Sequence, residues 1–100
     1  MESAYQVCLA FELRDRGLQV ETEVSLPVVY REVQLDVGYR IDLLVENQVV
    51  VEIKSVDSLM PIHQAQILSY LKMSDKKIGL LINFNVTLLK DGIKRLVNNL

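Results

Sequence analysis

The segment from residue 40 to residue 54 constrains the fold of this 100-residue chain most, because it fixes how two neighbouring strands must pair. Apolar side chains recur at every second position on either side of a short polar turn. The six residues in this pattern are Ile41, Leu43, Val45, Val49, Val51 and Ile53. Successive side chains point to opposite faces of a strand. All six therefore share one buried face only if Ile41 pairs with Ile53 and Val45 pairs with Val49.

This register places two acidic residues opposite each other on the other face of the sheet. Asp42 lies across from Glu52, and Lys54 follows two residues later on the same face. A two-residue turn at residues 47–48 would shift the register by one and separate the acids. Six buried apolar side chains are worth on the order of 1.5–3 kcal/mol each, more than a turn preference. We therefore expect a three-residue turn, or a bulge with the same effect.

The facing carboxylates predict a cation site. Two carboxylates directly opposite each other repel, so the sheet requires a compensating positive charge there. Oxygen ligands suit Mg²⁺ or Mn²⁺, and such an ion could polarise a phosphodiester and activate a water molecule. Lys54 would then stabilise the developing negative charge. The alternative is a solvated polar face on which Lys54 only forms an ion pair with Asp42 or Glu52.

A predicted helix after this hairpin carries polar side chains along one stripe. His63, Gln66 and Tyr70 lie at positions i, i+3 and i+7. A glutamine and a tyrosine four residues apart can jointly orient a phosphate, a water molecule or Lys54. The alternative is a helix rim that keeps its polar tips in water.

The remaining pattern predicts one α/β domain over residues 1–100, with a mixed sheet flanked by helices. We expect helices over residues 2–16 and 61–73, and strands over residues 18–30, 33–45, 49–56 and 77–84. Gly17 should end the first helix, Pro27 should end a strand or mark an edge, and Pro61 should begin the second helix. Residues 86–100 are ambiguous between a helix face and a hairpin at Asp91-Gly92, and the sequence favours strand or hairpin.

Composition narrows the function classes. The net charge is −2, whereas most nucleic-acid binders are basic because phosphate neutralisation drives their affinity. Action on nucleic acid therefore requires a bound cation or a local basic patch. Five basic residues in the last quarter of the chain form either such a patch or an ordinary solvated face. These residues are Lys76, Lys77, Lys90, Lys94 and Arg95. Cys8 has no partner for an internal disulfide, and no signal-peptide pattern occurs, so we expect a cytoplasmic protein.

Taken in order, these motifs resemble the PD-(D/E)XK nuclease superfamily. The matching pattern is Asp42, nine residues, Glu52-Ile53-Lys54, and then Gln66-x-x-x-Tyr70. The chain is similar above all to the GxxExxY branch of small proteins. That likeness extends to Glu2-Ser-Ala-Tyr5 and to residues 38–45, 79–85 and 89–93, and so covers nearly the whole chain.

The resemblance implies a restriction-endonuclease-like αβββαβ core and a nuclease that uses Mg²⁺ or Mn²⁺, most simply on DNA. It implies that Asp42 and Glu52 are metal ligands and that Glu2 approaches the metal from the first helix. It also implies that Lys54 positions or activates the attacking water, or stabilises charge.

The resemblance also implies a supporting set around these residues. Gln66 and Tyr70 would support the catalytic site. Arg40, on the face of Asp42, would contact a phosphate of the substrate, and His63 is the second residue expected to bind substrate.

Two other interpretations stay open. The chain could be a nucleic-acid- or protein-binding module that keeps the nuclease fold without turnover, which its acidic balance favours, or a protein active only inside a dimer. The glycine of GxxExxY and the helix usually before it have no counterpart ahead of Met1, so we expect a shortened N-terminal helix. We further expect a homodimer, because the apolar surface left uncovered should need a partner.

Overall fold

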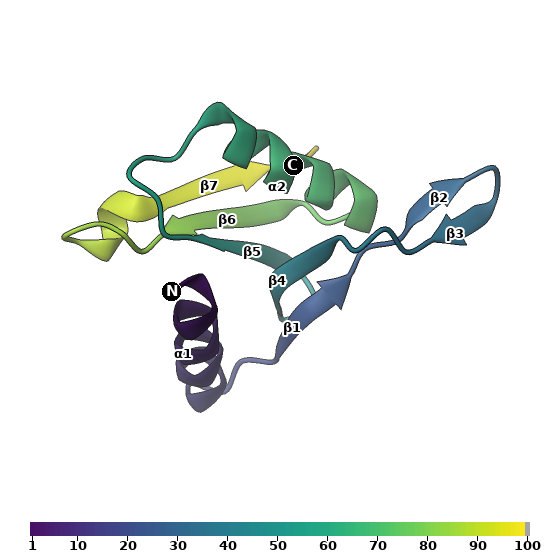
Figure 1. The fold of residues 1–100 in the computed structure, drawn as a ribbon. Helices are drawn as coiled ribbons and strands as arrows, with labels where there is room; N and C mark the ends of the chain where they lie inside the picture. The colour runs from purple at the N-terminus through teal and green to yellow at the C-terminus, as the bar shows by residue number, and fades with distance from the viewer. Residues whose placement is uncertain (100) are drawn as a thin grey trace.

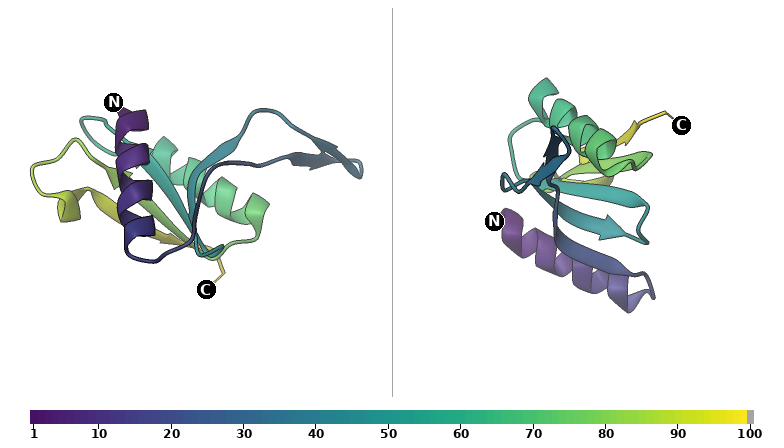
Figure 2. Two further views of the ribbon diagram at one scale, coloured as in Figure 1. Left: turned by 90° about the horizontal axis from the view of Figure 1, so that it is seen from below. Right: turned by 90° about the vertical axis from the view of Figure 1, so that its right-hand side faces the viewer.

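The structure is a computed structural model that describes residues 1–99, and it places a mixed five-stranded sheet between two helices (Figure 1). Helix α1 (Glu2–Asp15) lies on one face of the sheet and helix α2 (Pro61–Ser74) on the other (Figure 2). The order across the sheet is β1-β4-β5-β6-β7. These strands are β1 (Val20–Ser25), β4 (Arg40–Val45), β5 (Val49–Lys54), β6 (Ile78–Asn83) and β7 (Ile93–Val97). The expected α/β architecture is confirmed.

The predicted hairpin register is confirmed over its inner half. Leu43 pairs with Val51 and Val45 with Val49, which leaves a three-residue turn between β4 and β5. Glu46 in this turn has a φ of +52°. β5 and β6 run parallel and are joined through α2, while the other neighbouring strands are antiparallel.

Both helices begin and end as the sequence predicts, within one or two residues. After α1, Gly17 has a φ of +87°, a left-handed conformation that glycine adopts without steric cost. Pro61 is the first residue of α2, where its missing N–H would have had no partner inside the helix. The Met60 amide donates to Nδ1 of His63 over 2.9 Å, which further fixes this end. Asp75 ends the helix in a left-handed conformation.

The core consists of two apolar clusters, one beneath each helix. The cluster beneath α2 contains Leu26, Ile41, Leu44, Val50, Ile67, Tyr70, Leu71 and Leu81. The cluster beneath α1 contains Ala10, Val20, Leu43, Val51, Ile53 and Ile82. The central strands therefore bury side chains on both faces, as strands covered by helices on both sides do.

One part of the predicted hairpin face is wrong. Ile41 is buried as expected, but it packs beneath α2, whereas Leu43 packs beneath α1. The regular pairing is interrupted between them, because the Asp42 amide donates to the Glu52 carboxylate rather than to a strand carbonyl. Glu23, which lies on β1 across from Asp42, has a left-handed φ of +52°. These departures let the strand change its buried face at Asp42.

The strands expected over residues 18–30 and 33–45 are each broken in two, which corrects the prediction. Their outer parts, β2 (Val28–Tyr30) and β3 (Val33–Leu35), pair only with each other and form a projecting two-stranded ribbon (Figure 1). We call residues 26–39 the arm. Pro27 lacks a backbone N–H, and Gly38 has a φ of +88°, so neither continues a regular strand. The Leu26 amide donates to the Tyr39 carbonyl and closes the base of the arm.

The ambiguous C-terminal segment forms a short turn followed by a strand. Leu89–Gly92 is a 3₁₀ turn, and β7 then pairs antiparallel with β6, which confirms the preference for strand; Leu100 lies outside the described residues. Gly92 is required by close approach rather than by a hairpin, because a Cβ there would overlap the carbonyl of Asn83.

Candidate active site

The carboxylates of Asp42 and Glu52 are bound reciprocally across β4 and β5. The Asp42 amide donates to Oε2 of Glu52 over 2.8 Å, and the Ile53 amide donates to Oδ2 of Asp42 over 2.8 Å. Each side chain thus replaces the carbonyl that a regular strand pair would supply. Asp42 and Glu52 lie across from each other, as the hairpin register predicts. Each carboxylate also takes part in the backbone hydrogen bonding between β4 and β5.

Burial makes this acid pair electrostatically unfavourable. Glu52 is 3% exposed. Loss of hydration, followed by the neighbouring Asp42 charge, raises the pKa of Glu52 from 4.5 to about 8. Loss of hydration likewise raises the pKa of Asp42, and the charge of Glu23 adds to the rise. At neutral pH the folded protein therefore keeps the proton on Glu52.

Lys54 is the positive side chain that acts on both acids. It follows Glu52 by two residues on β5, and its charge lowers the pKa of both carboxyls, although less than burial raises them. Its backbone is held on the other side by the residue that follows β6, because the Phe84 amide donates to the Lys54 carbonyl over 2.9 Å. Lys54 is half-buried.

The first helix brings Glu2 to the end of β5. Oε2 of Glu2 accepts a hydrogen bond from the Ser55 amide over 3.3 Å, and its charge contributes to the raised pKa of Asp42. One turn along, the Tyr5 ring stacks on Phe84 with centroids 4.6 Å apart and planes 11° apart. That stack fixes the start of α1 beside the acids, so the Glu2-x-x-Tyr5 spacing has a physical reason in this structure.

Sequence reasoning missed Glu23 as part of this environment. It lies on β1 at the register position across from Asp42, and its charge raises the pKa of both Asp42 and Glu52. Its Oε1 accepts a hydrogen bond from Gln6 over 3.1 Å. The predicted pairing of β4 included only β5, so the strand on the other side of Asp42 was not considered.

Gln66 and Tyr70 lie on one stripe of α2 and contact each other. Nε2 of Gln66 donates to the Tyr70 hydroxyl over 3.1 Å. Burial raises the pKa of Tyr70, and the charges of Glu52 and Asp42 raise it further, which places the phenol within their field. Gln66 thus holds the Tyr70 hydroxyl, and the pKa of that hydroxyl responds to the charge of the acid pair.

The two residues expected to bind substrate are engaged within the chain. Arg40 pairs with Asp36 at 3.1 Å, and this pairing, after the Gly38 amide, lowers the pKa of Asp36. His63 accepts the Met60 amide through Nδ1, which leaves Nε2 for other contacts. Arg40 begins β4 two residues from Asp42, and His63 lies on α2 one turn before Gln66.

Asn83 is a second residue that sequence reasoning missed. It is 3% exposed and stands beside Lys54 in the β5–β6 register. Its side chain accepts the Val56 amide over 3.0 Å and donates to the Val56 carbonyl over 2.9 Å. Asn83 thereby fixes the chain that leaves β5 just after Lys54. The role of a buried asparagine side chain can be recognised only when the groups that form hydrogen bonds with it are known.

The donor set at the acids fits a magnesium-like ion. The second oxygens of Asp42 and Glu52 accept no hydrogen bond, and within residues 1–99 no fully buried side-chain oxygen lacks one, so neither of these two oxygens is fully enclosed. The same residues contain no cluster of three or more His, Cys, Asp or Glu side chains that could hold a metal. Mg²⁺ suits such a pair, because it keeps several waters and commonly binds one or two carboxylates plus substrate phosphates.

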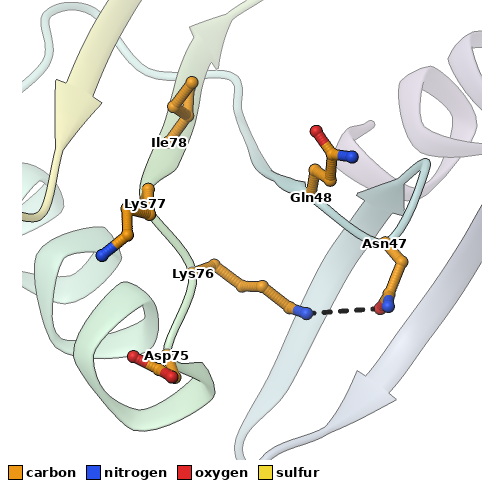
Figure 3. A pocket seen from close by; sticks show the side chains of 6 residues that line it. All are labelled: Asn47, Gln48, Asp75, Lys76, Lys77 and Ile78. Carbon is orange, nitrogen blue, oxygen red and sulfur yellow. Dashed lines mark hydrogen bonds between the residues drawn. The ribbon is translucent and has the colours of Figure 1, made fainter. Parts of the chain in front are cut away.

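A cavity of about 400 Å³ lies far from these acids, at the opposite ends of β5 and β6 (Figure 3). Nζ of Lys76 donates to Oδ1 of Asn47 there over 3.3 Å, and Lys77 lines the same hollow. Lys94 and Arg95 instead lie on the edge strand β7. The basic residues near the C-terminus are therefore spread over several surfaces rather than gathered in one patch.

A model of the PD-(D/E)XK nuclease superfamily matches residues 1–96 of this chain. No curated protein and no solved structure matches this chain. Across residues 1–99, no helix is long and apolar enough to cross a membrane.

Proposed function

Because the chain belongs to the PD-(D/E)XK nuclease superfamily, we propose that it is a metal-dependent nuclease that hydrolyses phosphodiester bonds in DNA. One observation carries the proposal: half-buried Asp42 and buried Glu52 are bound reciprocally beside Lys54. The cost of burying two facing acids is understandable if a divalent cation offsets their charge. We also propose that the chain belongs to the GxxExxY branch.

Asp42 and Glu52 would hold Mg²⁺ or Mn²⁺ through the carboxylate oxygens that accept no hydrogen bond, and Glu2 would assist only if it moved closer to them than it lies in this structure. Such an ion supplies Lewis-acid polarisation of a phosphate and lowers the pKa of bound water. The reciprocal hydrogen bonds from the strand amides hold both carboxylates in place before any ligand arrives. This rigidity is what a site requires to orient a reacting group.

The remaining side chains would act directly on the substrate. Lys54 places a compact positive charge beside the acids and would stabilise the charge that develops on the phosphate oxygens. The Tyr70 hydroxyl, oriented by Gln66, would hold a phosphate oxygen or the attacking water. Arg40 would exchange its exposed pairing with Asp36 for a phosphate, since exposed ion pairs are weak.

A non-catalytic binding module is the second candidate. Two observations favour it: the net charge of −2, and the lack, within residues 1–99, of a third acidic or histidine ligand close enough to complete a metal cluster. A homodimer is also proposed, because α1 exposes Val7 and Phe11 one turn apart.

The decisive experiment compares cleavage by the wild type, Lys54→Ala and the matched control Lys77→Ala. Lys77 is an exposed lysine at the other end of the sheet. Single- and double-stranded DNA and RNA are offered with Mg²⁺, Mn²⁺ or a chelator. The wild type and Lys77→Ala should cleave only with metal, and Lys54→Ala should be slower by about 10²–10³. Equal cleavage by all three proteins would indicate a contaminating nuclease and count against the assignment.

Calorimetry separates the two candidates. Mn²⁺ should bind the wild type and not Asp42→Asn, a variant whose amide oxygen still accepts the Ile53 N–H and so preserves the strand pairing. No cleavage of any substrate together with no heat of Mn²⁺ binding would favour the binding module.

A further inference from the structure

The outward side of α1 is apolar and exposed. Val7 and Phe11 lie one turn apart and are 68% and 66% exposed, and Cys8 between them is exposed as well. Between Tyr5 and Phe11 apolar residues point to every side of the helix, which is typical of a helix that is enclosed on both sides. Within residues 1–99, however, only the side of α1 that faces the sheet is covered, and Ala10 is its buried residue.

Half of the sheet face beneath α1 is uncovered too. Five strands about 4.8 Å apart form a sheet about 20 Å wide, whereas a helix is about 10 Å across. One helix therefore covers about half of the face. α1 packs on β1, β4 and β5, and in Figure 1 β7 lies on the far side of β6 from α1. The half formed by β6 and β7 is the half left open.

Apolar side chains project from this open half. Ile82 of β6 belongs to the core cluster beneath α1, Leu80 packs against the same cluster, and the register partner of Ile82 on β7 is Ile93. Val97 lies on the same face of β7 as Ile93, four residues later. Both β7 side chains are exposed. We call the surface formed by Leu80, Ile93 and Val97 the β6–β7 face.

A hollow of about 220 Å³ lies where α1 meets the β6–β7 face. Leu9 and Leu13 line it from α1, and Leu80 lines it from β6. Every described residue that lines this hollow is valine, leucine or isoleucine. Such side chains offer no hydrogen bond to a polar ligand, so the hollow favours contact with another apolar surface.

Charge favours contact between α1 and β7. Acidic residues outnumber basic ones in α1, whereas β7 contains Lys94 and Arg95 and no acid. Arg95 lies on the β6–β7 face, because its register partner is Leu80. Asp15 follows Phe11 by four residues and therefore lies on the outward side of α1. The outward side of α1 and the β6–β7 face are thus complementary in polarity and in charge.

We propose that a second copy of this chain covers both surfaces, with the outward side of α1 of each copy packed on the β6–β7 face of the other. Each α1 would then lie between its own sheet and the sheet of the second copy, which encloses it on both sides. The contact occurs twice, as two-fold symmetry requires, so the assembly closes at two copies. This inference names the surfaces of the homodimer proposed above and does not depend on nuclease activity.

The size of the two contacts suits a stable dimer. α1 has 14 residues and is about 21 Å long. With the open half of the sheet beside it, each copy would contribute a face about 20 Å square, whose accessible surface is on the order of the 800 Å² that a partner in a stable complex buries. Contact through α1 alone would cover about half of that face.

Sedimentation equilibrium of the full chain in chelator, from about 1 to 100 μM, measures the dissociation constant without substrate or metal. Val97→Ser changes the receiving surface and leaves α1 intact. It should weaken the dimer roughly 10-fold, because each dimer loses the apolar contact twice. Val29→Ser is the matched control, because Val29 is an exposed strand valine on the arm, outside both surfaces. Circular dichroism of each variant verifies that the fold is intact.

A charge swap tests which surfaces meet. Asp15→Arg and Arg95→Asp each place like charges opposite one another in the proposed contact and should weaken the dimer several-fold. Combining both substitutions in one chain restores opposite charges and should bring the dissociation constant back toward that of the wild type. Effects that arise at two unconnected sites would instead add.

Each outcome decides the inference separately from the nuclease assignment. A dimer weakened by Val97→Ser but not by Val29→Ser, together with recovery in the charge-swapped chain, supports it. A wild type that is monomeric at ~100 μM overturns it. A dimer that Val97→Ser leaves intact, or additive weakening in the charge-swapped chain, overturns it as well and assigns self-association to another surface. None of these results changes the expected metal-dependent cleavage, which is measured in its own assay.

Discussion

Replacing Glu52 with glutamine should make the protein more stable at alkaline pH in the absence of metal. The wild-type carboxyl is 3% exposed and faces Asp42, with a pKa of about 8 in the folded state against 4.5 ordinarily. Glutamine resembles the protonated acid, and its side-chain oxygen can still accept the Asp42 N–H. The substitution therefore keeps the hydrogen bond and removes the titration.

The sign of the effect follows from proton uptake. Between pH 4.5 and about 8 the unfolded chain has released the Glu52 proton while the folded protein still holds it. The free energy of unfolding therefore falls as pH rises through this window, by about 1.4 kcal/mol for each pH unit. The total is on the order of 5 kcal/mol, a large part of the stability of a small domain.

Urea unfolding in chelator, followed from mildly acidic to mildly alkaline pH, measures this slope. Glu52→Gln should lose roughly 3 kcal/mol less than the wild type between pH 5.5 and 8. Glu21→Gln is the matched control, because Glu21 is an exposed acid on β1 and should follow the wild-type curve. Parallel curves for the wild type and Glu52→Gln would refute the reasoning that burial and Asp42 hold the proton on Glu52.

Three further perturbations test other parts of the structure. Gly79→Ala would place a Cβ 2.8 Å from Cδ1 of buried Ile67, and should lower the free energy of unfolding by about 1–3 kcal/mol in urea titrations. Asn83→Ala would leave the half-buried Val56 amide without its side-chain partner, while the Val56 carbonyl would keep Asn85; calorimetric melting should show a loss on the order of 1 kcal/mol, and unchanged melting would contradict that role. Light scattering at ~100 μM, a concentration at which a micromolar dimer is mostly assembled, should give a dimeric mass that Phe11→Ser reduces; a monomeric wild type would exclude self-association at that strength.

The acid pair was predictable because burial of apolar side chains decides the register of a hairpin. Leu43 opposite Val51 and Val45 opposite Val49 follow from alternation alone, and Asp42 then meets Glu52. The second helix was predictable for a similar reason, since Pro61 marks its start. Those features depend on residues that are close in sequence.

Features that depend on distant or irregular backbone were not predictable. The switch of Ile41 to the opposite core requires the broken pairing at Asp42, which no alternation pattern contains. The proximity of Glu23 depends on the antiparallel pairing of β1 with β4, and the arm depends on where two strands leave the sheet. Asn83 gives no sequence signal of its own, because an asparagine after an apolar strand equally suits a turn.

The reciprocal hydrogen bonds between β4 and β5 also make two backbone amides into spectroscopic reporters of the carboxylates. The Asp42 amide hydrogen donates to Glu52, and the Ile53 amide hydrogen donates to Asp42. Hydrogen bonds to an ionised acceptor are shorter and stronger than those to a neutral one, so each amide proton resonance should move as its carboxylate loses a proton or gains a cation. In a nitrogen–proton correlation spectrum, the two peaks would follow the two acids separately, each observed from the opposite strand.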